Sequence, residues 1–134
     1  MSRPIVVDTS ALMAILTNEP DAGLYIDELA ARRGNVLISA GTWMEALMVV
    51  AHRRPDDGAK RLRELSAEID LQVEPVDQVM SEVAYIGWQQ FGKSNHPARL
   101  NYGDCFSYGL ARAYDLRLLY KGKDFSQTDV VGVL

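Results

Sequence analysis

Residues 5–12 read Ile5-Val6-Val7-Asp8-Thr9-Ser10-Ala11-Leu12, and this stretch decides the fold. Its three β-branched residues predict a short buried strand that ends at Asp8. Thr9 and Ser10 have side chains that cap helices, and the apolar residues after them predict a helix over 11–16. A strand followed at once by a helix is typical of an α/β unit, here with an acidic residue at the carboxyl end of the strand.

The rest of the chain continues this alternation of strands and helices. Further strands are expected at 36–38, 71–76 and 118–120, with 129–133 as a candidate fifth strand. Helices are expected over 22–33, 42–53, 58–68, 78–91 and 102–114, the last two capped by Asp77 and Asn101. The pattern favours an α/β fold with a central parallel sheet of four to five strands, flanked by helices on both faces. Ligands of such sheets bind beyond the carboxyl ends of the strands.

Composition limits the class of protein. The chain has 134 residues, which predicts a single domain over 1–134, and its 48% hydrophobic and 24% charged residues are typical of a soluble globular protein. No apolar run approaches the ~18 residues of a membrane helix, and the first residues lack a signal-peptide pattern, so we expect a cytoplasmic protein. The single cysteine, Cys105, excludes an internal disulfide and a thiolate zinc site.

Charge is unevenly distributed along the chain. The net charge of −4 alone argues against a nucleic-acid binder. Residues 92–123, however, contain six basic and two acidic residues, whereas the remainder contains eight basic and sixteen acidic ones. A local basic segment on an acidic protein can hold a phosphate backbone, although a solvated surface of uneven charge explains the pattern equally well.

Three acidic residues stand alone in apolar surroundings. Asp8 is the only charged residue between positions 4 and 18, Glu45 between 36 and 51, and Asp104 between 101 and 111. A buried carboxylate without a partner costs several kcal/mol or takes up a proton, and three close together also repel one another. A bound cation relieves both effects. Carboxylate oxygens suit Mg²⁺ or Mn²⁺, which need only one or two protein carboxylates.

Each of these acids also has a purely structural interpretation. Asp8 could cap the first helix, and Asp104 could be a first-turn acid that interacts with the helix dipole. Glu45 lies in the middle of a helix, so its structural alternative is a salt bridge with His52 or an arginine. Farther along the chain, Asp124 follows the fourth predicted strand.

Five features together carry a family resemblance. They are Val6-Val7-Asp8-Thr9-Ser10-Ala11-Leu12, the lone Glu45, Leu100-Asn101-Tyr102-Gly103-Asp104-Cys105-Phe106-Ser107-Tyr108, Lys121-Gly122-Lys123-Asp124-Phe125, and Thr128-Asp129. In order and spacing the chain resembles the PIN-domain ribonucleases and, more narrowly, the VapC toxins of bacterial toxin–antitoxin pairs. The opening motif occurs in many α/β folds, whereas the segment 100–108 with its downstream partner is much more specific.

The resemblance implies a PIN-like α/β/α sandwich with Asp8, Glu45, Asp104 and Asp124 in one pocket. It also implies a Mg²⁺ or Mn²⁺ cofactor and endoribonuclease activity on structured RNA such as tRNA or rRNA, leaving a 5′-phosphate and a 3′-hydroxyl. The partners it implies are an antitoxin protein and a second copy of the toxin. Asp129 competes with Asp124 for the place of the fourth acid.

We expect Asp8 and Asp104 to be the main metal ligands. Glu45 and Asp124 are then expected to hold waters around the metal or to complete a second metal site. RNA phosphates are expected to contact Lys93, His96 and Arg99 in the loop before Asp104, which is otherwise an ordinary solvated loop.

Other functions find less support in the sequence. Cys105 paired with His52 or His96 would suggest a thiol nucleophile, but its place in an apolar helix predicts a small buried side chain. A receiver-like phosphorylation domain would need its second carboxylate on a strand. A surface around Met13, Leu16, Met44 and Met48 is expected to bind an antitoxin segment, because exposed apolar patches mark partners. A non-catalytic binding module could use the apolar, Met-rich helices over 11–16 and 42–51 as a groove for an amphipathic partner helix. Such a module has no need of three isolated carboxylates.

Overall fold

The computed structural model describes residues 3–134 and contains a four-stranded parallel sheet in the order β3-β2-β1-β4. The strands are β1 (Ile5–Val7), β2 (Val36–Ser39), β3 (Gln72–Glu74) and β4 (Leu118–Leu119). The helices are α1 (Thr9–Leu16), α2 (Ala22–Ala31), α3 (Ala40–Arg53), α4 (Gly58–Ile69), α5 (Gln78–Phe91) and α6 (Tyr102–Ala113). The predicted parallel α/β class is therefore confirmed, with element ends shifted by up to two residues.

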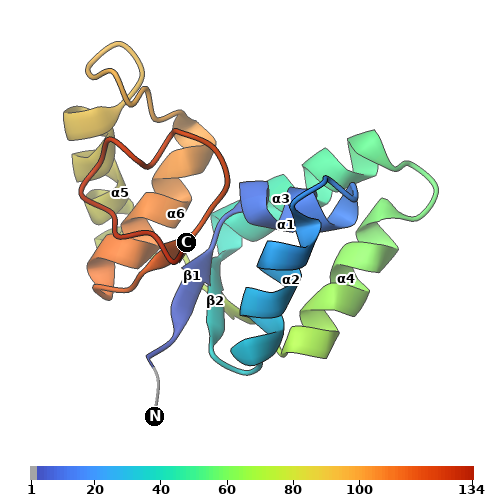
Figure 1. Cartoon of the computed structure of the whole chain (residues 1–134). Coiled ribbons are helices and arrows are strands. Elements are labelled where there is room, and N and C mark those ends of the chain that lie inside the picture. Colours follow the sequence, from blue (N-terminus) through green and yellow to red (C-terminus); the bar gives the residue numbers. More distant parts are fainter. Residues whose placement is uncertain (1–2) are drawn as a thin grey trace.

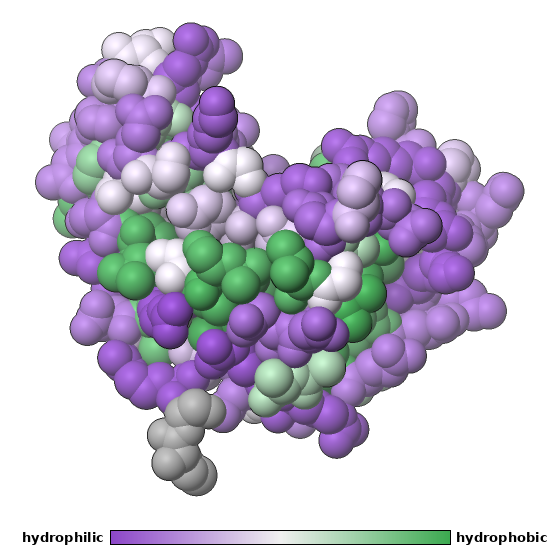
Figure 2. All heavy atoms as spheres, viewed as in Figure 1, coloured by the Kyte–Doolittle hydropathy of each residue, from purple (hydrophilic) through white to green (hydrophobic). Residues whose placement is uncertain are grey.

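The side chains of β1 divide the core into two parts. Ile5 and Val7 pack with buried residues of α1, α2, α3 and α4, whereas Val6 packs with buried residues of α5 and α6. This alternation is the two-residue period of a strand, and it places helices on both faces of the sheet. Figure 1 shows the result, with α5 and α6 on one side of the strands and α1 to α4 on the other. Figure 2 shows the surface hollowed between these two layers at the top of the view.

Two details differ from the sequence-based expectation. Residues 129–133 do not form a fifth strand, since they make only one parallel bridge, from Gly132 to Leu118. The cap of α1 is Asp8, whose side chain accepts a hydrogen bond from Ser10 N at 3.0 Å, while Thr9 and Ser10 already lie inside the helix. The predicted caps of α5 and α6, Asp77 and Asn101, are confirmed.

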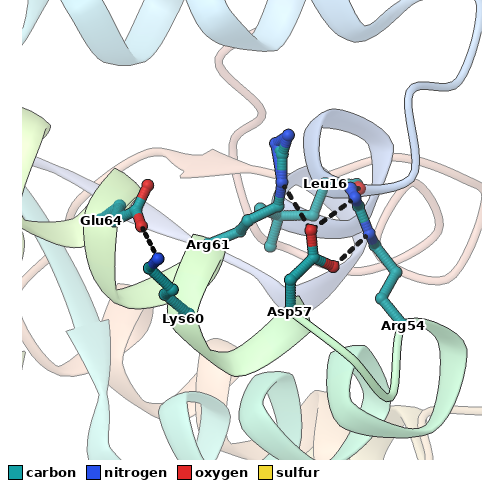
Figure 3. A network of polar contacts seen from close by, with 6 residues as sticks. All are labelled: Leu16, Arg54, Asp57, Lys60, Arg61 and Glu64. Atoms are coloured by element: carbon teal, nitrogen blue, oxygen red, sulfur yellow. Dashed lines mark hydrogen bonds and ion pairs between the residues drawn. The ribbon is translucent and has the colours of Figure 1, made fainter.

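An ion-pair network fixes the turn between α3 and α4. Arg54 donates to both carboxylate oxygens of Asp57, at 3.1 and 3.0 Å, and Arg61 donates to the same carboxylate at 3.3 Å. Another nitrogen of Arg54 donates to the Leu16 carbonyl oxygen at 2.8 Å, at the end of α1 (Figure 3). Each of these groups therefore has a partner of opposite charge or polarity. The network ties α1, α3 and α4 into one layer.

None of the helices described in residues 3–134 combines the length and apolar character needed to cross a membrane.

Candidate active site

The structure brings the four predicted acidic residues to the carboxyl edge of the sheet. Asp8 lies directly after β1, Glu45 in the middle of α3, Asp104 in the first turn of α6, and Asp124 in the turns after β4. All four line one cavity of about 290 Å³. This is the edge at which parallel α/β folds bind ligands.

Asp8 is buried and is held entirely by hydroxyl and amide donors. Ser107 on α6 donates to its Oδ1 at 2.5 Å, and the Ser10 hydroxyl donates to its Oδ2 at 2.7 Å. The Ser107 hydroxyl is itself 3.1 Å from the Thr42 hydroxyl of α3, and both side chains are fully buried. Asp8 thus combines the helix-capping role with a fixed orientation at the cavity. A chain of hydroxyl groups from two other helices sets that orientation.

Glu45 reaches the cavity without any basic partner. Thr9 donates to its Oε1 at 2.6 Å, and within residues 3–134 no cation lies at ion-pair distance from it. Its other oxygen lies against Gly103, where a Cβ atom would collide with the carboxylate. The salt bridge considered for Glu45 is therefore absent from the described part of the chain. Gly103 leaves the space that lets α3 bring this carboxylate up to α6.

Asp104 carries the clearest electrostatic signature of the site. Burial raises its pKa to about 7, and the negative charges of Asp8 and Asp124 and a side-chain hydrogen bond with Asp124 raise it too. The Asn101 backbone amide, which donates to Asp104 Oδ2 at 3.1 Å, acts in the opposite direction. The same pair of residues forms a reciprocal cap of α6. Capping therefore explains the position of Asp104, and burial together with the neighbouring acids explains its raised pKa.

Asp124 and Asp129, the two candidates for the fourth acid, lie in different surroundings. Asp124 lines the cavity and acts on Asp104. Asp129 pairs with Arg112, whose Nε lies 3.4 Å from Asp129 Oδ2, and its hydrogen bond helps raise the pKa of Tyr108. Asp129 is thus already neutralised by a cation away from the cavity. Of the two, only Asp124 joins the acidic group.

Basic side chains stand at the rim of the same cavity. Lys121 forms ion pairs with Glu19 and with Asp21, the latter at 2.8 Å, and its backbone amide donates to the Ser10 hydroxyl at 3.0 Å. Arg53 also lines the cavity. Sequence reasoning did not assign these residues, or Thr42 and Ser107, to the site. A signal existed for Ser107 alone, since it follows Asp104 by three residues and so shares its helix face.

The thiol alternative does not fit the structure. Cys105 is buried, as predicted, and burial together with the charge of Asp104 raises the pKa of its thiol to about 11. A thiol with so high a pKa is rarely the reactive thiolate. His52 is exposed on α3, and the His96 ring packs edge-on against Phe91 at 5.1 Å.

The three residues predicted to contact RNA do not all lie in one cavity. Lys93 and Arg99 line a neighbouring cavity that also contains Lys123. His96 does not line it. Its Nδ1 accepts a hydrogen bond from the Ala98 amide at 3.0 Å, inside the loop.

The donor set fits a hard divalent cation. It consists of carboxylate oxygens, and within residues 3–134 none of the four acids forms an ion pair. Within residues 3–134 no three acidic, histidine or cysteine side chains converge closely enough to ligate one ion directly. Mg²⁺ and Mn²⁺ need only one or two protein carboxylates and keep several waters, so carboxylates of this cavity could hold either ion.

Comparison with known proteins agrees with this geometry. The family model described as "PIN domain" matches residues 5–131. Ribonuclease VapC30 of Mycobacterium tuberculosis is 39% identical over 132 residues, which cover 96% of this chain and 98% of that protein. Among solved structures, M. tuberculosis VapC20, a toxin that cleaves the Sarcin-Ricin loop, superposes with a TM-score of 0.77 at 21% identity, covering 96% of this chain and 98% of that one. A toxin–antitoxin complex from Klebsiella pneumoniae gives a TM-score of 0.70 at 22% identity over 95% and 94%. The chain belongs to the PIN-domain family and, within it, to the VapC ribonucleases.

Proposed function

We propose that the chain is a Mg²⁺- or Mn²⁺-dependent endoribonuclease that hydrolyses phosphodiester bonds in structured RNA, such as transfer or ribosomal RNA. The observation that carries this proposal is the cavity lined by Asp8, Glu45, Asp104 and Asp124, none of which forms an ion pair within residues 3–134. A fold gains no stability from four such acids in one cavity, whereas a divalent cation that acts on an RNA phosphate needs carboxylate ligands. The choice of structured RNA is supported by the family and by the VapC20 toxin of the same fold.

In this proposal Asp8 and Asp104 hold the metal, and Glu45 and Asp124 complete the site. The metal, when bound, supplies a water of lowered pKa and stabilises negative charge on the transferring phosphoryl group. Asp104 must release its proton before it can bind a cation, because its pKa is raised to about 7. Glu45 is held by Thr9 and can orient a water for attack on phosphorus.

Ser107 acts as a positioning residue in the same scheme. Its hydroxyl donates to Asp8 Oδ1, so that oxygen keeps one direction, and Thr42 fixes the Ser107 hydroxyl in turn. Hydrogen-bond partners of this kind orient metal ligands, and their loss typically lowers metal affinity or activity by about 10- to 100-fold.

The proposed biological role is that of the toxin in a toxin–antitoxin pair, acting on RNA in the cytoplasm and silenced by a bound antitoxin. This role is supported by the family and by the Klebsiella toxin–antitoxin complex of the same fold. Met44 and Met48 on α3 are 58% and 65% exposed, and exposed apolar side chains of this size suit an apolar segment of a partner. Met13 and Leu16, which the sequence suggested for the same surface, are buried in the core and do not belong to it. A homodimer remains a prediction.

Cleavage of total cellular RNA by the purified protein tests the proposal. We expect cleavage with Mg²⁺ or Mn²⁺ and none with a chelator. Asp104→Asn should lower the rate on the order of 100-fold or more, because it removes a metal ligand without changing shape.

A matched pair of variants tests the fourth acid in the same assay. Asp124→Asn should lose cleavage, and Asp129→Asn should keep it, because only Asp124 lines the cavity. Cleavage that persists in the chelator and in Asp104→Asn would show that the acidic cavity is not the catalytic centre.

A further inference from the structure

A second cavity, of about 450 Å³, adjoins the acidic one. Asp124 lines both cavities, so the two adjoin at that residue. The second cavity is lined by three basic side chains, Lys93 and Arg99 from the loop before α6 and Lys123 from the turns after β4. We call the surface formed by Lys93, Arg99 and Lys123 the basic groove. It places positive charge directly beside the carboxylates.

The three cations of the basic groove are free to bind an anion. All three are exposed, and within residues 3–134 none of them has a carboxylate at ion-pair distance. The cations at the rim of the acidic cavity and in the α3–α4 turn differ, since Lys121, Arg54 and Arg61 are all paired. Unpaired neighbouring cations repel one another, and a phosphate backbone between them removes that repulsion.

The loop that carries two of these cations is held in a fixed conformation. Lys93 N donates to the Leu100 carbonyl oxygen at 2.8 Å, and Leu100 N donates to the Phe91 carbonyl oxygen at 2.9 Å. Arg99 has a φ of +57°, a left-handed conformation that a side chain of this kind rarely adopts. The closed loop therefore holds Arg99 in an unfavourable backbone conformation while its side chain lines the groove.

Amide groups complete the lining of the basic groove. Gln127 contributes its side chain, and Asn101 uses its Oδ1 to cap α6, which leaves its Nδ2 as a donor. Cations combined with amide donors are the groups that contact phosphate oxygens and sugars in nucleic-acid complexes. They read no bases, so such a surface positions a strand without selecting its sequence.

We propose that the basic groove binds the sugar–phosphate backbone of the RNA strand immediately beside the scissile phosphate. The four carboxylates repel RNA until a cation is bound, so positive charge must bring the strand to the cavity. Of the basic residues that line the cavity itself, Lys121 is already paired and Arg53 is a single cation. The basic groove adjoins the cavity at Asp124 and adds three cations without ion pairs within residues 3–134. This inference rests on the proposed ribonuclease function, and its ligand is the RNA sugar–phosphate backbone, bound without sequence preference.

The test is the affinity of the full-length protein for a fluorescently labelled single-stranded RNA of mixed sequence, measured in EDTA so that no cleavage occurs. The variant combines Lys93→Ala, Arg99→Asn and Lys123→Ala. Asn tolerates the left-handed conformation at 99, so the change removes charge without adding strain. We expect at least tenfold weaker binding, and a slope of log affinity against log salt that is smaller by about 2, at ~0.7 per phosphate contact on a single strand.

The control combines Lys60→Ala with Arg63→Ala on α4, in the other helical layer, where both side chains are exposed and Lys60 pairs with Glu64. RNA affinity and salt slope should stay unchanged in this control. Unchanged affinity in the groove variant, or an equal loss in the α4 control, would overturn the inference. A polyglutamate peptide that binds as tightly as RNA through the same three residues would identify a site for acidic protein segments and overturn it as well.

Cleavage and binding are separate readouts in this design. If the wild-type protein does not cleave RNA but the groove variant still loses affinity, the basic groove is supported and the ribonuclease proposal fails. If the wild-type protein cleaves and the groove variant binds RNA as before, the ribonuclease proposal is supported and the basic groove fails. Thermal melts of all variants establish that each is folded, and Mn²⁺ affinity should be equal in all of them.

Discussion

Asp57 and Asp104 both lie at the start of a helix, yet they have opposite surroundings. Asp57, before α4, is held by two arginines at 3.0 to 3.3 Å. Asp104, in the first turn of α6, has other acids as its charged neighbours, and burial with their charges raises its pKa to about 7. The charge of Asp57 is neutralised by arginines of the same chain, whereas Asp104 has no such partner within residues 3–134. The first arrangement serves the stability of the fold, and the second leaves a place for a cation from outside.

The largest effect that separates the two regions should come from Glu45→Gln. This change keeps shape and removes one charge from the acidic cavity, so the free energy of unfolding without metal should stay the same or rise. RNA cleavage should fall on the order of 100-fold, because the remaining amide no longer orients a water for attack. Urea denaturation without metal and a cleavage assay measure the two quantities.

Asp57→Asn is the counterpart and should give the reverse pattern. Its ion pairs are partly exposed, so the loss of stability should be about 1 kcal/mol or less, with cleavage unchanged. A Glu45→Gln protein that is destabilised but still active would mean that Glu45 has a structural role.

A smaller effect is expected from Ser107→Ala. Without the hydroxyl, Asp8 Oδ1 loses its 2.5 Å hydrogen bond, and we expect Mn²⁺ affinity to fall about 10-fold by calorimetry. Ser81→Ala is the control, because Ser81 donates only to a carbonyl oxygen of its own exposed helix turn. Equal Mn²⁺ affinity in Ser107→Ala and the wild-type protein would remove the positioning role.

The pH dependence follows from the raised pKa of Asp104. The ordinary pKa of an aspartate is 3.8, so between pH 3.8 and about 7 the folded protein keeps a proton on Asp104 that the unfolded chain releases. The protonated Asp104 therefore contributes most to the free energy of unfolding at low pH. That contribution is lost as the pH rises through about 7. A metal must displace the proton below that pH. Mn²⁺ affinity should therefore rise by up to about tenfold per pH unit toward pH 7 and level off above it. In Asp104→Asn the residual affinity should show little of this rise. An equal rise in both proteins would assign the proton to another group.

The smallest effect is expected from Gly103→Ala. The added Cβ would collide with the Glu45 carboxylate, so Glu45 must move and cleavage should fall several-fold while α6 remains folded. Gly23→Ala on α2 has no atom within 4 Å of the added carbon and should only stabilise its helix, by about 0.5 to 1 kcal/mol. Full activity in Gly103→Ala would show that the position of Glu45 is not critical.

Local patterns in the sequence were sufficient for the parallel sheet and for three of the acids. β-branched runs and helical periodicity mark elements whose faces are buried, and isolated acids stand out in apolar segments. The prediction of a fifth strand at 129–133 was wrong. The neighbouring strand β4 has only two residues, and Gly132 forms a single bridge with Leu118. Whether 129–133 pairs as a strand depends on contacts with a distant part of the chain, and the periodicity of the sequence does not describe such contacts.

The surroundings of the acids could not be derived in the same way. Thr42 and Ser107 meet Asp8 only because α3 and α6 pack against each other. The choice between Asp124 and Asp129 depends on where the chain turns after β4 and on the pairing of Asp129 with Arg112. These are contacts between residues far apart in sequence, and no local pattern encodes them.

We propose that the acidic cavity holds a cation, and metal-dependent stability tests this proposal most directly. Thermal melts with and without saturating Mn²⁺ should show stabilisation of the wild-type protein, by about 2.7 kcal/mol at a hundredfold excess over the dissociation constant. The same increment should remain in Asp57→Asn and should nearly disappear in Asp8→Asn and Asp104→Asn. Melts that Mn²⁺ leaves unchanged in the wild-type protein, or shifts equally in all four proteins, would contradict the account.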